Sequence, residues 1–267
     1  MLLSRRLRAV LVLVVVAGAL VAGISHKYVW IYLTRKPVLR PLAQDLLSNP
    51  KTSNNPEALL EKANRLAWLF NWPKAEPLYV RAEELFRERR DTRNETYARV
   101  GRIRAQSERM SWVDVSDMLG QQLEVPVAKT DPKLRLWCLA AKGYTDLEIN
   151  PASAKRAWTE AQAIAHQLRE TQWESRAKGE LGIIGFLEGD SRRAATMVGD
   201  ALLSAMASGD VGGQVRYLEM LGNGFNEAKR YGEALAFFER AIKTSSANPD
   251  AGFPFMAYEG ESESLVS

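Results

Sequence analysis

The stretch LEMLGNGFNEAKRYGEALAFFERA, residues 218–241, decides the fold. Apolar residues recur in it three and four positions apart, which gives each of two successive helices one apolar face. The residues that define the pattern are Leu218, Leu221, Gly222, Phe225, Ala234, Phe238 and Ala241. The large residues fill space, whereas glycine and alanine stand where two helices approach too closely for a bigger side chain. The stretch therefore predicts two packed helices joined by a short turn.

Copies of this pattern recur along the chain at a nearly constant step. The alanine near the start of the second helix has counterparts at Ala75, Val113, Ala154, Ala194 and Ala234, spaced 38, 41, 40 and 40 residues apart. The small residue of the first helix recurs at Ala63, Gly101, Gly182 and Gly222. In the third copy its position is ambiguous within residues 141–143. The bulky residue of the second helix recurs as Tyr79, Trp158, Val198 and Phe238. Because one helix pair cannot bury its own apolar face, such units are stable only when they stack.

This pattern resembles the tetratricopeptide repeat, whose helix pairs carry a large residue, Leu-Gly and an aromatic residue, followed by Ala-x3-Phe-x2-Ala. The resemblance covers about residues 57–250, and the last copy matches best. The usual period is about 34 residues, so the chain is similar to the longer-period repeats of bacterial signalling and protease-like proteins. The resemblance implies an all-α fold for residues 57–267, a right-handed α-α superhelix of about five helix pairs. A final helix, expected after residue 253, is either a cap of the last repeat or the start of a further one.

Residues 1–33 are expected to form a signal-anchor or transmembrane helix. Three arginines, Arg5, Arg6 and Arg8, precede sixteen residues without a charge, residues 9–24. This run covers about 24 Å as a helix, somewhat less than the roughly 30 Å of a hydrocarbon core. Interfacial aromatic residues follow at residues 28–32. We therefore expect a membrane anchor through residues 9–33, with the repeats on the periplasmic or extracytoplasmic side. The alternative is a signal peptide, cleaved near residues 17–23, that leaves a secreted protein.

Residues 34–56 have the composition of a linker between the anchor and the repeats. They contain four prolines, Pro37, Pro41, Pro50 and Pro56, with serines and asparagines between them. Proline and turn-forming residues at this density disfavour a long helix or strand.

The positive charge of the chain belongs to its N-terminal segment. The formal net charge is +4, but residues 1–40 hold seven basic residues and no acidic one. The remaining 29 basic and 32 acidic residues give the rest of the chain a net charge of −3. A nucleic-acid-binding domain needs a basic surface that follows phosphates, so the sequence argues against a nucleic-acid partner.

The sequence offers no group of residues for catalysis or metal binding. The two histidines, His26 and His166, lie far apart, and Cys138 is the single cysteine, so no zinc-ligand spacing occurs. No glycine-rich phosphate loop and no nucleophile motif is present. We expect Cys138 to be a small buried hydrophobic residue, and we expect no cofactor and no enzyme activity.

The function that the resemblance implies is the binding of a protein or peptide partner along the concave wall of the first helices. In the Leu-Gly register, the inner positions expected to be exposed are Asn64, Trp68, Arg102, Gln106, Ile183, Phe186, Asn223, Asn226 and Glu227. The sequence thus predicts a membrane-tethered scaffold. The alternative is the sensory or regulatory part of a larger signalling or protease-like enzyme whose output domain is absent.

Overall fold

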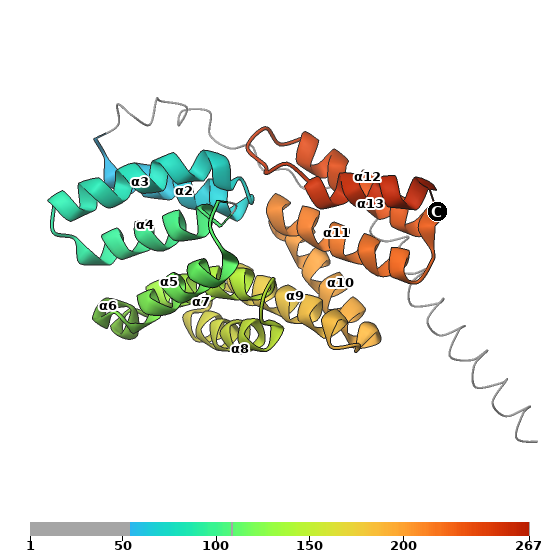
Figure 1. Ribbon diagram of the computed structural model, residues 1–267, viewed down its shortest axis with the longest axis horizontal. Coiled ribbons are helices and arrows are strands. Elements are labelled where there is room, and N and C mark those ends of the chain that lie inside the picture. The colour runs from blue at the N-terminus through green and yellow to red at the C-terminus, as the bar shows by residue number, and fades with distance from the viewer. Residues whose placement is uncertain (1–53, 108, 267) are drawn as a thin grey trace, which may run out of the picture. The chain divides into compact units, whose positions relative to one another are not determined.

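The computed structural model describes residues 54–107 and 109–266, and within these ranges it contains helices, turns and loops but no strand (Figure 1). The expected all-α fold is confirmed. The helices are α2 (Pro56–Trp68), α3 (Trp72–Glu88), α4 (Thr92–Ala105), α5 (Trp112–Glu124), α6 (Pro126–Thr130), α7 (Pro132–Asp146), α8 (Pro151–Leu168), α9 (Thr171–Leu187), α10 (Ser191–Ser208), α11 (Val211–Glu227), α12 (Tyr231–Ser246) and α13 (Phe255–Val266).

The expected anchor, residues 1–33, and nearly all of the expected linker, residues 34–56, lie outside the described residues. None of the helices within the described ranges is long and apolar enough to cross a lipid bilayer.

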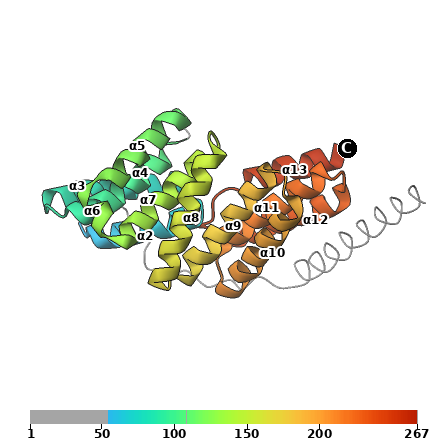
Figure 2. The same ribbon diagram turned by 90° about the horizontal axis from the view of Figure 1, so that it is seen from below.

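Each helix packs mainly on its neighbours in the sequence. The most extensive contacts join α9 to α10, α11 to α12, α3 to α4, α7 to α8, α2 to α3 and α8 to α9. Figure 2 shows α8, α9 and α10 side by side. The second unit is less regular, because α5 packs more on α7 than on α4 and the short helix α6 precedes α7.

The repeat register is correct in four copies and wrong in one. Ala75, Ala154, Ala194 and Ala234 lie near the starts of second helices and are at most 1% exposed. Val113, however, is 54% exposed, and the buried residue at the equivalent place is Val115. With Val115 the spacings become 40, 39, 40 and 40 residues. The pattern was ambiguous here because α5 begins with two adjacent apolar residues, of which neither is buried.

The bulky residues of the second helices fit against the small residues of the first helices. Phe238 on α12 is fully buried between Gly222 on α11 and Gly260 on α13. A Cβ atom on Gly222 would lie only 2.6 Å from the Phe238 ring. Gly143 on α7 faces Trp158 in the same way, with 2.6 Å to the indole nitrogen, and so it is the small residue of the ambiguous third copy. The expected pairing of small and large residues is confirmed at these sites.

Turns within and between units carry the expected helix-end signals. Gly189 and Gly209 have positive φ angles of 85° and 73°, a conformation that glycine adopts at little cost. The aspartates that follow them, Asp190 and Asp210, are N-caps of α10 and α11, since their side chains accept hydrogen bonds from backbone N–H groups.

The turn between α2 and α3 contacts a segment close to the C-terminal end of the described chain. The two segments, residues 68–71 and residues 249–252, are called the clasp below. Its hydrogen bonds run from the Asn71 side-chain amide to the carbonyls of Asp250 (3.1 Å) and Ala251 (3.3 Å), and from the Gly252 N–H to the carbonyl of Leu69 (2.9 Å). The first helix pair is therefore bound by residues about 180 positions further along the chain. In Figure 1 the end of the α2–α3 pair faces the loop that precedes α13.

Candidate binding site on the first helices

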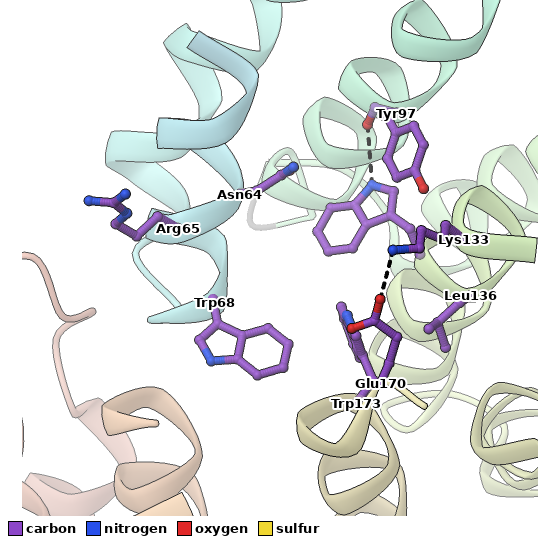
Figure 3. Close-up of a pocket in the computed structure, with 9 residues that line it drawn as sticks. Asn64, Arg65, Trp68, Tyr97, Lys133, Leu136, Glu170 and Trp173 are labelled. Carbon is purple, nitrogen blue, oxygen red and sulfur yellow. Dashed lines mark hydrogen bonds and ion pairs between the residues drawn. The ribbon is translucent and has the colours of Figure 1, made fainter. Parts of the chain in front are cut away.

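A hollow of about 320 Å³ lies among four of the first helices. Its lining comes from α2, α4, α7 and the start of α9, helices that belong to four different units (Figure 3). The lining residues are Asn64, Arg65, Trp68, Tyr97, Lys133, Leu136, Trp137, Glu170 and Trp173. The hollow is thus assembled by packing between units and not by any single repeat.

Three tryptophans form the apolar wall of this hollow. The ring centroids of Trp68 and Trp173 lie 4.7 Å apart with an interplanar angle of 83°, and those of Trp137 and Trp173 lie 6.2 Å apart at 70°. These edge-to-face arrangements are the favoured ones for aromatic pairs. The indole nitrogen of Trp137 donates a hydrogen bond to the carbonyl of Tyr97 at 3.2 Å, which fixes the orientation of that ring.

The polar groups of the hollow include one amide with a free donor. The Oδ1 atom of Asn64 accepts a hydrogen bond from the Tyr79 hydroxyl at 2.8 Å. Burial raises the pKa of Tyr79 well above its ordinary value, so this hydroxyl stays protonated and remains a donor. Because the hydroxyl of Tyr79 occupies the Oδ1 atom of Asn64, the Nδ2 group is the other end of the amide, and it points toward the hollow (Figure 3).

The charged groups at the hollow are paired. Lys133 Nζ lies 2.8 Å from a carboxylate oxygen of Glu170. Arg65 points away from the hollow (Figure 3) and pairs with Glu61 at 3.3 Å. The hollow consequently presents apolar rings and a few polar atoms, with no unbalanced charge from Lys133 and Glu170.

Trp68 is held from its other side by Arg176 on α9. The Arg176 guanidinium lies 3.6 Å from the centroid of the Trp68 indole and donates to the Trp68 carbonyl at 3.2 Å. It also bonds both carboxylate oxygens of Asp210, at 2.6 and 2.7 Å. Burial acts to lower the pKa of Arg176, but the negative charge of Asp210 outweighs it and the net pKa is raised. Arg176 therefore stays charged and ties the end of α2 to α9 and to the start of α11.

Two of the residues predicted for the groove lie in this hollow, Asn64 and Trp68. Two others, Arg102 and Gln106, lie in a separate polar cluster on α4 and its C-terminal end. Arg102 bonds the buried Glu83 at 2.6 Å and Gln106 at 3.2 Å. Since these groups satisfy one another, they are less available to a partner than expected.

The remaining predicted residues lie on α9 and α11, away from the hollow. Ile183 and Asn226, expected to be exposed, are only 4% and 8% exposed. Asn226 donates to the Gly260 carbonyl at 3.3 Å and accepts from Ser264 at 2.8 Å, so its amide joins α11 to α13. Phe186 and Asn223 are half-buried, and Glu227 is exposed.

The sequence prediction missed Tyr97, Trp137, Trp173, Lys133 and the other residues that complete the hollow. One signal was available, because Tyr97 and Trp137 lie 40 residues apart and so occupy the same place in successive units. Trp173 gave no such signal, since its place beside Trp68 results from the contact between α2 and α9.

Among residues 54–107 and 109–266, no three His, Cys, Asp or Glu side chains are placed to hold a metal ion. Cys138 is fully buried, as expected, and burial raises its pKa to about 12, so it is not a reactive thiolate. His166 lies on the surface, 3.1 Å from Glu174.

No protein-family model matches the chain, and no curated protein matches it.

Proposed function

We propose that this protein is a membrane-tethered scaffold that binds a segment of a partner protein. In this proposal the helix pairs stack as a right-handed superhelix of the tetratricopeptide-repeat type, residues 9–33 hold the chain in a membrane, and the repeats lie on the extracytoplasmic side. The observation that carries the binding function is the tryptophan-lined hollow on four of the first helices.

The size and chemistry of the hollow fit a side chain of a partner better than a complete small-molecule substrate. Its volume of about 320 Å³ is at the lower end of the roughly 300–1,000 Å³ typical of small-molecule sites. Tryptophan is the residue type most enriched where a few contacts supply most of the binding energy. Leu136 adds a buried aliphatic surface beside the indoles. An apolar anchor residue of a peptide would be desolvated here while the peptide backbone stays at the rim.

A selection of peptides against the full-length chain tests this function. A displayed library of random peptides should yield binders, and Trp173→Ala should weaken those binders about tenfold or more, since it removes one wall of the hollow. Trp112→Ala is the matched control, because Trp112 is a half-buried tryptophan on α5 outside the hollow. Circular dichroism should show that both variants keep their helix content. Absence of any enriched peptide, or equal binding by Trp173→Ala, would contradict the proposal.

A further inference from the structure

The unsatisfied side-chain donors that face the hollow point to a particular class of peptide. The Nδ2 group of Asn64 and the indole N–H of Trp173 have no hydrogen-bond partner among the described residues, and both are directed to the hollow in Figure 3. The one carboxylate of the lining, that of Glu170, is paired with Lys133. The hollow thus offers two side-chain donors without a protein partner in the described part of the chain, beside a Lys133–Glu170 pair whose charges compensate one another.

We infer that the hollow binds a proline-rich segment in the polyproline II conformation. This inference rests on the proposed peptide-binding function and names the class of peptide. Proline has a backbone carbonyl but no N–H, so a proline-rich segment brings acceptors and no backbone donors that would need partners. A polyproline II helix makes no internal hydrogen bonds, and its carbonyls are free to accept from Asn64 and Trp173.

The shape and charge of the hollow agree with the same class. Aromatic-lined grooves are the usual sites for proline-rich segments, because flat rings pack against the pyrrolidine ring and the segment is already rigid. The indoles of Trp68 and Trp173 meet at 83° and form a corner that a pyrrolidine ring can enter. An acidic or basic peptide gains little here, because the charges of Lys133 and Glu170 already compensate one another.

Three fluorescein-labelled peptides and the full-length chain in mild detergent provide the test, with fluorescence anisotropy as the readout. The first is a proline-rich nonapeptide, the second has alanine in place of every proline, and the third is an amphipathic leucine-rich helix. We expect the first peptide to bind at least about tenfold more tightly than the other two. Stronger binding of the alanine or the leucine-rich peptide would overturn the proline inference and leave peptide binding in place. Binding of none of the three would also overturn the proline inference, and the peptide selection described above decides the proposed function separately.

A change at one side-chain position separates the role of the donors from the shape of the hollow. Asn64→Asp keeps the oxygen that accepts from Tyr79 and replaces the free donor by an acceptor. It should weaken the proline-rich peptide about tenfold or more, because a carbonyl of the peptide then meets an oxygen. Asn150→Asp is the control, since Asn150 is an exposed asparagine outside the hollow and aspartate keeps the oxygen that caps α8. Unchanged binding by Asn64→Asp, with the proline-rich peptide still preferred, would overturn the assignment of the donors.

Discussion

At the scale of single residues, the fit between Gly222 and Phe238 explains why the repeat needs glycine on one helix and a ring on the next. Phe238 is fully buried, and the space that a side chain on Gly222 would use is already filled by its ring. Interiors of proteins are packed at crystal-like density, so such a contact leaves no room for an added methyl group.

Gly222→Ala should therefore destabilise the protein by about 1–3 kcal/mol through overpacking, despite the higher helix propensity of alanine. Gly120→Ala is the matched control, since Gly120 also lies in a helix but has nothing within 4 Å of the place of its Cβ atom. That variant should be stabilised by up to about 1 kcal/mol. Urea denaturation of both variants measures the difference. Equal stability of the two variants would mean that the close packing at Gly222 has no energetic effect.

At the scale of helices and turns, the clasp attaches the turn that follows Trp68 to residues 249–252. Asn71 has two roles in it, because its side-chain oxygen caps α3 at Lys74 N (3.3 Å) while its amide group donates to residues 250 and 251. The two roles use different atoms of one side chain, so they can be separated by one substitution.

Asn71→Asp should keep the cap and open the clasp, since a carboxylate oxygen would face two carbonyls. We expect a loss of about 1–3 kcal/mol in stability and weaker peptide binding, because the turn that follows Trp68 keeps its attachment to Arg176 but loses its attachment to residues 250 and 251. Asn150→Asp is the control, since Asn150 caps α8 through its oxygen at Ser153 N and lies on the surface. Distances between spin labels at Pro77→Cys and Lys243→Cys report opening directly. An unchanged distance distribution in Asn71→Asp would contradict this role.

The helices could be predicted from the sequence wherever a local pattern of apolar and small residues specifies them. Ala154, Ala194 and Ala234 marked second helices correctly, because each must be small wherever it meets a neighbouring helix. Val113 was misplaced by two residues, because two apolar residues lie together at the start of α5. Of the residues that line the hollow, the sequence predicted only Asn64 and Trp68, since a repeat pattern describes contacts within a unit and between adjacent units. The contact of α2 with α9 joins residues 108 positions apart, and no periodic signal encodes it.

At the scale of the whole molecule, one buried carboxyl group should make stability depend on pH. Glu219 on α11 is 7% exposed and accepts a hydrogen bond from the Ala257 N–H at 3.2 Å. Burial raises its pKa from 4.5 to about 7, although Arg216 and the Ala257 N–H act to lower it. Between these values the folded chain holds a proton that the unfolded chain has lost. The free energy of unfolding should therefore decrease as the pH rises through this window and level off above it, by about 3 kcal/mol in total.

Glu219→Gln should remove this pH dependence, because glutamine keeps the accepting oxygen and has no proton to lose. At pH values above the window the variant should be more stable than the unaltered chain, and below the window the two should be similar. Glu239→Gln, at an exposed position on α12, should follow the unaltered chain at every pH. Thermal unfolding over a pH series makes the comparison. If the stability of Glu219→Gln still decreased with rising pH, the pH dependence would have to come from another titratable group.

The clasp also restricts how such a chain can change in evolution. In an open array of repeats, units can be gained or lost with little effect on the others, because each contacts only its neighbours. Here residues 68–71 are bound both by α9 and by residues 249–252. If one helix pair between residue 71 and residue 249 were deleted or duplicated, α9 or residues 249–252 would no longer reach the turn at residues 68–71. Natural variants of this chain should therefore differ in the lengths of their loops and keep the number of their helix pairs.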